Sequence, residues 1–411
     1  MRAIIFEKVR DDFPVLQKEI DDKPIIYLDS ACVALRPKLV IEAINHYYCE
    51  YSACGGRTLH KLGMKVTEET ESARTKIKNF INAKHVNECV FTVNTTTGIN
   101  MVARGLDFSK NDLVITEDYA HNSNVVPWQL LEKQQGITHC ILDTKEDGIF
   151  TIETLDEILQ KSSASKKLVS FCHTSNITGY TIPAAEIIKV AHEHEALVHL
   201  DAAQSVPHQP VDVQKLDADF ISFSLHKMCG PSGIGILYGK SDLFENLNPS
   251  DVGGGTVSDV TKDESNFVDL PARFEAGLQN YAGIIGAGAT IDYLEKLKMK
   301  NIYEYEKKLS DYLFSGLKAL NFPMKILGPD DPTKRVSLAA IAFENKISAH
   351  VIGMILDENN IFARSGRHCT HLWHNKLKIH SSLRPSLYFY NTIEEIDKFL
   401  EIFEAGVRRF L

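Results

Sequence analysis

The chain has little that would suit it to a membrane or to a nucleic acid. Its 45 lysines and arginines are outnumbered by 54 aspartates and glutamates, so it lacks the basic surface that nucleic acids and anionic membranes require. No apolar run approaches the roughly 18 residues of a membrane span. The start, MRAIIFEKVRDD, has an apolar run too short for a signal peptide. We therefore expect a cytoplasmic protein that binds neither membrane nor nucleic acid.

Cysteine is present, but not in a pattern that builds a scaffold. The 8 cysteines are scattered along the chain, and none form a CxxC pair. Their spacing argues against a disulfide framework or a zinc ribbon and favours reduced thiols, most of them buried as small apolar side chains. The chain also lacks internal repeats and low-complexity linkers, so domain boundaries must be inferred from the pattern of strands and helices.

That pattern alternates between residues 85 and 240. Runs such as DLVITED, KLVSFCH and ADFISFS are short, apolar and β-branched, as strands are. Between such runs lie helical stretches such as TLDEILQKS and AAEIIKVAHEH. The alternation predicts an α/β fold with a mostly parallel sheet covered by helices on both faces.

After a glycine-rich joint, DVGGGTVSD, the pattern changes. We expect a long helix near residues 282–320 and then a smaller α+β domain. The last helix should begin at Thr392, because Glu395 stands three residues later and completes a capping box. The predicted division is an N-terminal segment packing with the small domain (1–25), a large domain (26–295) and a small C-terminal domain (296–411).

Polar residues follow three of the predicted strands, at the edge where parallel sheets bind ligands. FTVNTTTGIN places threonines 95–97 at a strand-to-helix junction, where free N–H groups attract anions. VHLDAAQS places Asp201 after a buried strand, and ISFSLHKMCG places Lys227 after the next. The threonines or the aspartate alone would be read as ordinary helix caps. The lysine is less ordinary, since lysines are rarely buried unless paired or functional.

Together these residues fit one ligand, pyridoxal 5′-phosphate (PLP). A lysine amine condenses with an aldehyde, and an aspartate keeps a pyridinium nitrogen protonated so that the ring accepts electrons. Lys227 and Asp201 supply these two groups. The candidate phosphate ligands are Thr96, Ser224 and His226, with Thr95 beside them.

The chain resembles the class V aminotransferase superfamily of fold-type I PLP enzymes and, within it, the group II (Suf-type) cysteine desulfurases. The resemblance covers nearly the whole length, through YLDSACVALRP, TTTGIN, AHNSNVVPWQ, HTSNITG, HLDAAQS, SLHKMCGPSGIGILYG, FEAGLQN, RSGRHC and LRPSLYFYNT. It implies a large domain with a seven-stranded sheet and a smaller domain that carries the catalytic cysteine loop. It also implies conversion of L-cysteine to L-alanine, with the sulfur used for iron–sulfur clusters or other thio-cofactors.

The resemblance also implies roles for individual residues, and some of these involve a partner. The protein should be a homodimer that delivers sulfur to an acceptor or scaffold protein of iron–sulfur assembly. Arg57 and the turn at Gly277 should reach the partner subunit's site. The implied roles are Lys227 as the cofactor lysine, Asp201 as the pyridinium partner, His121 stacked on the ring, Asn176 and Gln204 beside the phenolic oxygen and substrate, Arg384 on the substrate carboxylate, Arg364 and Arg57 near the substrate, and Cys369 as the sulfur acceptor.

The stretch RSGRHCTHLWH around Cys369 has other interpretations. Histidines at 368, 371 and 374 recur every three residues and resemble zinc ligands, but one short loop would have to wrap the ion unaided. An inert core cysteine is a second alternative, although the loop is polar. Arg364, Arg367 and His368 would stabilise a thiolate, the nucleophilic form. We expect no metal and a reactive Cys369.

The chain departs from the family pattern at several positions. Leu278 stands where a threonine usually contributes to the neighbouring subunit's phosphate site, Thr97 and Ala120 each replace a common glutamate, and SLHK replaces SGHK. These departures leave room for a different substrate, such as L-selenocysteine. The alternatives are therefore a selenocysteine lyase, a class V aminotransferase and, more distantly, a non-catalytic paralogue.

Overall fold

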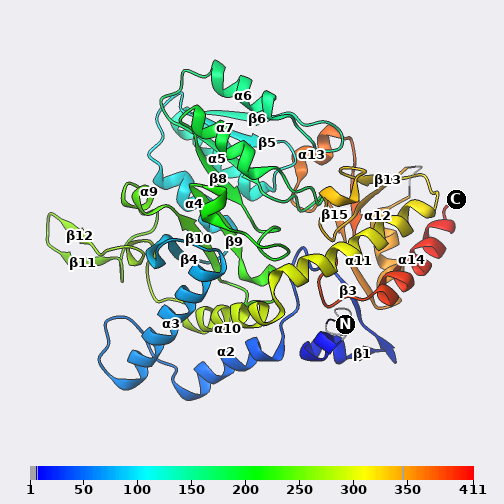
Figure 1. Cartoon of the computed structure of the whole chain (residues 1–411), viewed down its shortest axis with the longest axis horizontal. Helices are drawn as coiled ribbons and strands as arrows, with labels where there is room; N and C mark the ends of the chain where they lie inside the picture. The colour runs from blue at the N-terminus through cyan, green and yellow to red at the C-terminus, as the bar shows by residue number, and fades with distance from the viewer. Residues whose placement is uncertain (1–5, 7, 345–346) are drawn as a thin grey trace.

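The computed structural model describes residues 6, 8–344 and 347–411, in which helices pack around two large sheets and two short hairpins form separate two-stranded sheets (Figure 1). Residues 1–5 and 7 of the predicted N-terminal segment lie outside the described residues. In the described part of that segment, Phe6 stacks on Tyr305, and Phe13 packs against Tyr390 near the end of the chain. The N-terminal segment thus contacts residues far away in sequence.

The larger sheet confirms the predicted α/β fold. Its seven strands lie in the order β4-β10-β9-β8-β7-β5-β6, and only β10 runs antiparallel to its neighbours. All but the edge strand β6 are almost wholly buried, which explains their continuous apolar sequences. The strands are β4 (Cys89–Thr92), β5 (Leu113–Glu117), β6 (Thr138–Leu142), β7 (Lys167–Cys172), β8 (Leu197–Asp201), β9 (Phe220–Ser224) and β10 (Gly235–Gly239).

Helices flank this sheet. α4 packs on β9 and β10, α6 packs on α7, and α10 packs on α2 and α3. None of the helices in the described ranges is both long and apolar enough to cross a lipid bilayer. The helices are α2 (Lys38–Glu50), α3 (Lys61–Phe80), α4 (Thr95–Gly105), α5 (Val126–Gln135), α6 (Ile152–Lys161), α7 (Ala184–Glu193), α8 (Val213–Leu216), α9 (Ser241–Glu245) and α10 (Tyr281–Leu297).

The smaller sheet has five strands in the order β13-β14-β16-β15-β3. Its edge strand β3 comes from the start of the chain and pairs in parallel with β15. The predicted three-part division remains a prediction. The elements are β3 (Ile26–Leu28), β13 (Met324–Leu327), β14 (Ala340–Phe343), β15 (Ile361–Gly366), β16 (Ser382–Arg384), α11 (Met299–Ala319), α12 (Ala349–Asp357), α13 (His371–Lys376) and α14 (Ile393–Arg408).

Three local features bear on the sequence predictions. The capping box at Thr392 and Glu395 is present and begins α14, as predicted. The single long helix predicted near 282–320 is wrong, because α10 ends at Leu297 and α11 begins at Met299. Lys298 lies between them with φ 68°, in the left-handed region. A helix end of this kind is usually marked by glycine, and neither glycine nor proline stands at this position in the sequence. An exposed hairpin of β11 (Val257–Val260) and β12 (Ser265–Phe267), which the sequence did not indicate, follows the glycine-rich joint.

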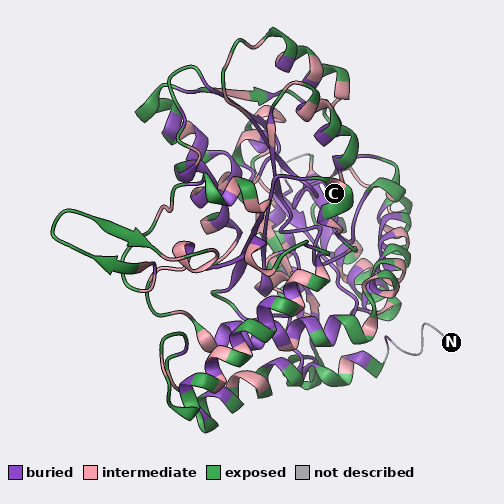
Figure 2. Cartoon of the chain, turned by 60° about the vertical axis from the view of Figure 1, so that its left-hand side comes forward, coloured by how far each residue is buried: buried purple, intermediate pink, exposed green. Residues whose placement is uncertain are grey.

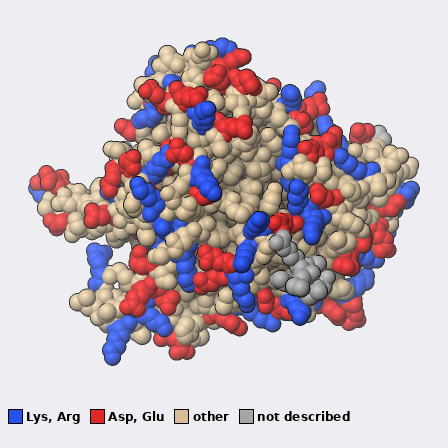
Figure 3. Space-filling model, in the orientation of Figure 1, with Lys and Arg blue, Asp and Glu red and all other residues tan. Residues whose placement is uncertain are grey.

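Burial concentrates around the two sheets. Figure 2 shows the strands of the larger sheet largely buried and the β11–β12 hairpin projecting with its residues exposed. In Figure 3, positive and negative side chains are interspersed over the visible face. The carboxyl ends of β7, β8 and β9 and the loop between β15 and α13 line one cavity.

Candidate active site

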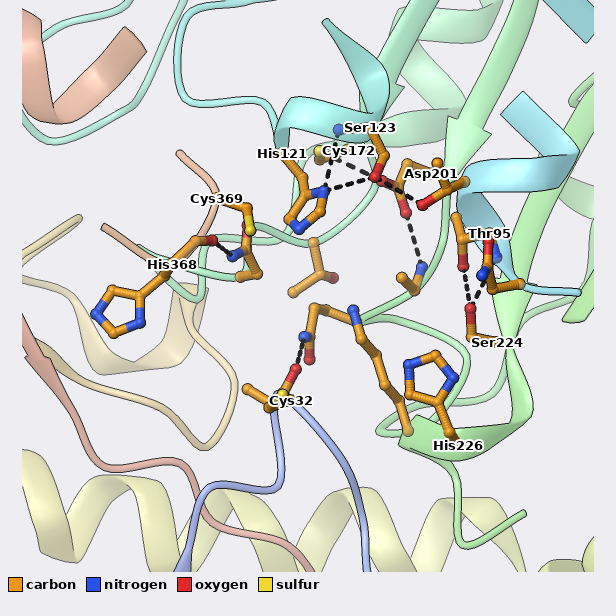
Figure 4. A pocket seen from close by; sticks show the side chains of 18 of the residues that line it. Cys32, Thr95, His121, Ser123, Cys172, Asp201, Ser224, His226, His368 and Cys369 are labelled. Atoms are coloured by element: carbon orange, nitrogen blue, oxygen red, sulfur yellow. Dashed lines mark hydrogen bonds between the residues drawn. The ribbon is translucent and has the colours of Figure 1, made fainter. Parts of the chain in front are cut away.

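A cavity of about 320 Å³ brings together residues from both sheets (Figure 4). Most residues predicted from sequence to form a site line it, although they span nearly 300 positions of the chain. The exception is Arg57. The predicted residues that line the cavity are Thr95, Thr96, His121, Asn176, Asp201, Gln204, Ser224, His226, Lys227, Arg364, Cys369 and Arg384.

Lys227 and Asp201 form the electrostatic centre of the cavity. Asp201 ends β8, and Lys227 ends a 3₁₀ turn that follows the neighbouring strand β9. Loss of hydration lowers the pKa of Lys227, and the nearby Asp201 carboxylate partly opposes the effect. Burial likewise raises the pKa of Asp201, opposed by Lys227 and by the N–H of Ala203, which donates to Oδ1 at 3.0 Å. A buried carboxylate suits a cationic ring nitrogen, and an amine that readily loses its proton suits an aldehyde.

Hydroxyl groups gather where α4 begins. The Thr95 N–H donates to Ser224 Oγ at 2.8 Å, and the hydroxyls of Thr95 and Ser224 lie 2.6 Å apart. The Thr96 hydroxyl lies 2.7 Å from that of Ser123. Asn94 caps the helix by accepting from the Thr97 N–H. A helix N-terminus lined by hydroxyls attracts a phosphate group, so this end of the cavity fits the phosphate of PLP.

His121 and His226, which line the cavity, are neutral. The Ser123 N–H donates to His121 Nδ1 at 3.2 Å, which leaves the proton of the neutral ring on Nε2. Burial lowers the pKa of His121 to about 3, and the charges of Lys227 and Arg384 contribute. Burial also lowers the pKa of His226 to about 4. A neutral imidazole can lie against a cationic ring without charge repulsion.

Buried polar atoms without partners face the substrate side. Among the described residues, Arg384 Nε, Asn176 Oδ1 and Gln204 Oε1 are buried and have no hydrogen-bond partner. Other atoms of these side chains are bound: Arg384 Nη1 donates to the Asn176 carbonyl at 2.9 Å, and Gln204 Nε2 donates to the Ala31 carbonyl at 2.7 Å. Unsatisfied groups are costly to bury, so a donor and two acceptors left open in one cavity indicate a polar ligand. The residues present therefore fit PLP and an amino acid.

The cavity reaches the loop that carries Cys369. Cys369 is exposed and lies between β15 and α13. Arg364 makes a two-point ion pair with Asp29, with Nη2 2.8 Å from Oδ2. Burial lowers the pKa of His368 to about 2. Of the groups expected to stabilise a thiolate, His368 is thus neutral and Arg364 is already paired.

The three histidines around Cys369 have separate partners. His368 Nε2 lies 3.1 Å from the Ser382 carbonyl, His371 Nδ1 lies 2.9 Å from Asn122 Nδ2, and His374 Nδ1 lies 2.9 Å from the Thr370 carbonyl. No group of three or more His, Cys, Asp or Glu side chains within the described ranges could hold a metal ion. The spacing of these histidines therefore reflects three different contacts.

Sequence reasoning missed several residues in or near the cofactor cavity, including Ser123, Cys32, Cys172 and Glu117. Cys32 and Cys172 line it, and Cys172 Sγ lies 4.0 Å from Asp201 Oδ2. Glu117 ends β5, accepts from the Cys172 N–H at 2.8 Å, and leaves Oε2 without a partner among the described residues. Burial raises its pKa to about 8. The strand-end rule that selected Asp201 would also have selected Glu117.

Arg57 lies in a second cavity, of about 730 Å³, together with Gly277 and Leu278. Its approach to a partner subunit's site remains a prediction. Leu278, which stands where the family usually has threonine, is 78% exposed.

Known proteins resemble the chain over its whole length. Residues 26–399 match the family described as aminotransferase class-V. A probable cysteine desulfurase of Synechocystis sp. is 40% identical over 407 residues, which cover 98% of this chain and 96% of that protein. The apo structure of a cysteine desulfurase from Thermococcus onnurineus NA1 has a TM-score of 0.92 at 35% identity and covers 98% of both chains. Cysteine desulfurase CsdA from Escherichia coli, solved with an S-sulfonic acid, has a TM-score of 0.89 at 30% identity, covering 100% of this chain and 99% of its own.

Proposed function

The chain belongs to the class-V aminotransferase family, and from this we propose that it is a PLP-dependent L-cysteine desulfurase. The observation that carries the proposal is that Cys369, an exposed thiol, lines the same cavity as Lys227, Asp201 and Arg384. A transaminase has no use for a thiol at that place. The names of the full-length relatives support the same activity.

Each residue contributes one part of the reaction. PLP, when bound, supplies an electron-accepting ring conjugated to the substrate's α-carbon. Lys227 would hold the cofactor, and its amine is placed to move a proton at the substrate's α-carbon. The Asp201 carboxylate keeps the ring nitrogen protonated, and Arg384 binds the substrate carboxylate through its unpartnered Nε.

The sulfur transfer belongs to Cys369. Its thiolate attacks the sulfur of L-cysteine, so a sulfur–sulfur bond forms and the substrate's Cβ–Sγ bond breaks. The carbon takes up a proton to give L-alanine, and Cys369 is left as a persulfide. This is nucleophilic catalysis by the chain in addition to its covalent hold on the cofactor.

Replacement of Cys369 tests the proposal. In Cys369→Ala, PLP should remain bound and L-cysteine should still change its absorption spectrum, because the cofactor residues are untouched. Production of alanine and sulfide should fall at least about 10³-fold, since the variant lacks the sulfur acceptor. Cys49→Ala, which removes another exposed thiol, is the control and should keep wild-type activity.

Two results would contradict the assignment. One is a persulfide, trapped by alkylation after a single turnover and located by mass spectrometry, on a cysteine other than Cys369. The other is an amino-group transfer to a keto acid that proceeds at full rate in the variant. Selenocysteine should be assayed alongside, because selenium leaves carbon more easily and a selenocysteine lyase would tolerate the loss of the thiol.

The remaining parts of the proposal concern the surroundings of the enzyme. We propose a homodimer, a protein acceptor of sulfur for iron–sulfur or other thio-cofactor synthesis, and a cytoplasmic location. Each of the 8 cysteines, all within the described residues, is a free thiol, which is usual in the reducing cytosol.

A further inference from the structure

The loop that carries Cys369 has an unusual backbone. His368 and Cys369 adopt φ angles of 48° and 59°, and both lie in the left-handed region. Residues with a side chain rarely occupy that region. The two residues form the centre of a turn that the Thr370 N–H closes by donating to the Arg367 carbonyl at 2.8 Å, and contacts with other parts of the chain add to this local hydrogen bond. The contacts of residues 366–371, here called the nucleophile loop, therefore decide where the thiol lies.

Two carbonyl groups of the loop accept hydrogen bonds from the larger domain. Asn176 Nδ2 donates to the carbonyl of His368 at 2.7 Å. The backbone N–H of Asn122 donates to the carbonyl of Cys369, also at 2.7 Å. Both left-handed residues are thus held through their own carbonyl oxygens. Figure 4 shows Cys369 and His121, the neighbour of Asn122, on the same side of the cavity.

Asn122 makes a second contact, with the other end of the loop. Its Nδ2 lies 2.9 Å from Nδ1 of His371, the first residue of α13. One residue therefore contacts the loop on both sides of Thr370. Asn122 also directly follows His121, so the residue expected to stack on the cofactor ring and the residue that holds the thiol share a peptide bond.

The helix after the loop is fixed to the same segment of the larger domain. The buried Trp373 packs edge-on against Tyr119, with ring centroids 6.4 Å apart. Lys376 Nζ lies 2.5 Å from Asp118 and 2.6 Å from Asp143. In Figure 1, α13 lies beside the larger domain. Because α13 is anchored, both ends of the loop between β15 and α13 are fixed. Asn122 then contacts the loop between these ends, at Cys369 and His371.

We propose that Asn122 is a positioning residue that keeps the nucleophile loop in its left-handed conformation, and thereby keeps the Cys369 thiol at the cavity. The inference rests on the proposed function for its catalytic consequence. Reacting groups displaced by about 1 Å can lose roughly 10²-fold in rate, so a relaxed loop should slow sulfur transfer. Binding of PLP and of the substrate carboxylate should change little, because no hydrogen bond or ion pair among the described residues joins Asn122 to Lys227 or Arg384.

Two substitutions separate the contacts of Asn122. Asn122→Ala removes the amide that meets His371 and keeps the backbone N–H. Asn122→Pro removes both donors. Proline suits this place, because Asn122 is the first residue of a 3₁₀ turn and the preceding His121 has φ −58° and ψ 142°, which are compatible with a following proline. Asn246→Ala is the matched control, since Asn246 makes one side-chain hydrogen bond, to the Asp242 carbonyl at 2.8 Å, far along the chain from the loop.

Hydrogen exchange of the PLP-loaded protein without substrate is the first measurement. Asn122→Pro should accelerate exchange in residues 366–377 while other peptides and the melting temperature stay close to wild type. Steady-state kinetics with L-cysteine is the second. kcat should fall about 10- to 100-fold in Asn122→Pro and only a few-fold in Asn122→Ala, with KM and PLP affinity nearly unchanged.

Wild-type exchange in the loop of Asn122→Pro, or faster exchange with an unchanged kcat, would overturn the proposal. If the wild-type protein makes no alanine from L-cysteine, the proposed function fails, and the exchange data alone still decide whether Asn122 holds the loop. Should Asn122→Pro not fold, Asn122→Ala and His371→Ala replace it. Both substitutions remove the same contact, between Asn122 Nδ2 and His371 Nδ1. The loop of the double variant should therefore exchange no faster than that of either single variant, and additive effects on exchange would contradict the inference.

Discussion

At the scale of single residues, two buried carboxyl groups on either side of Cys172 have different electrostatic partners. Asp201 has the cationic Lys227 nearby and accepts from the Ala203 N–H. Glu117 accepts a hydrogen bond from the Cys172 N–H and lies close to the Asp201 carboxyl, and burial raises its pKa to about 8. Because burial and then the nearby Asp201 carboxyl favour the neutral form, Glu117 is protonated at neutral pH, whereas Lys227 and the Ala203 N–H favour the ionised form of Asp201.

The protonation of Glu117 predicts how stability depends on pH. Its folded pKa of about 8 lies above its ordinary value of 4.5, so between these pH values the folded chain binds a proton that the unfolded chain does not. Stability therefore falls as pH rises through this window, by up to roughly 1.4 kcal/mol per pH unit. The groups that face the carboxyl are Cys172, Asp201 and Tyr119.

Glu117→Gln should remove this dependence, because an amide of the same shape does not titrate. Urea unfolding of both proteins at pH 5, 6, 7 and 8 gives the comparison. The wild-type midpoint should decline more steeply than that of the variant. Parallel curves would show that Glu117 does not gain a proton on folding.

At the scale of secondary-structure elements, glycines set the position of α4. A Cβ at Gly235 of β10 would lie 2.6 Å from Asn94 Cα and 2.7 Å from its carbonyl carbon, so β10 can approach the start of α4 only without a side chain there. A Cβ at Gly98 of α4 would likewise lie 2.6 Å from Oγ of Ser222 in β9. These close contacts place the N-terminus of α4 and its hydroxyls beside Ser224.

Gly235→Ala should therefore weaken PLP binding by moving the backbone at Asn94. Such overpacking commonly costs about 1–3 kcal/mol, so the melting temperature should fall and the Kd for PLP should rise roughly tenfold. Fluorescence titration with PLP measures the affinity. Gly254→Ala is the control, because an added Cβ meets nothing within 4 Å at that position, and it should behave as wild type. Equal affinities in the two variants would contradict the role of this contact.

At the scale of the whole molecule, the cofactor cavity lies between the two sheets, and a second cavity lies apart from it. The second cavity is lined by Arg57, Arg74, Glu275 and Gly277, among others. Arg74 and Glu275 form a buried pair, with Nη1 2.6 Å from Oε1, which fixes the segment before Gly277. Arg57 itself is exposed in the single chain, as expected of a residue that would act on a partner.

A subunit-mixing experiment tests that expectation. Lys227→Ala and Arg57→Ala should each be nearly inactive alone, the first in its own site and the second in the partner's. After the two are mixed in equal amounts and allowed to exchange subunits, about a quarter of wild-type activity should return, because each mixed dimer has one intact site. Activity that stays at the level of the separate variants would show that Arg57 serves its own subunit or none.

The sequence alone determined the features that depend on neighbours along the chain. Strand periodicity placed Asp201 and Lys227 at the ends of adjacent strands, and the capping box placed the start of α14, because both are local signals. The PLP chemistry followed from residue types at those ends. The resemblance to a family then gave Cys369 its role as sulfur acceptor, whereas the local sequence only argued against a zinc ligand and a core cysteine.

Only the tertiary structure decided what depends on packing between distant segments. In the structure β3 pairs with β15, and Glu117 accepts a hydrogen bond from the Cys172 N–H. The predicted long helix is divided in two at Lys298. The tertiary structure also gave the histidines around Cys369 separate partners and joined Asn122 to a loop almost 250 residues away. Hydrogen bonds, burial and left-handed backbone at these places are imposed by atoms that are remote in sequence. Local propensity could name the reactive groups, but three-dimensional packing decided how they face one another.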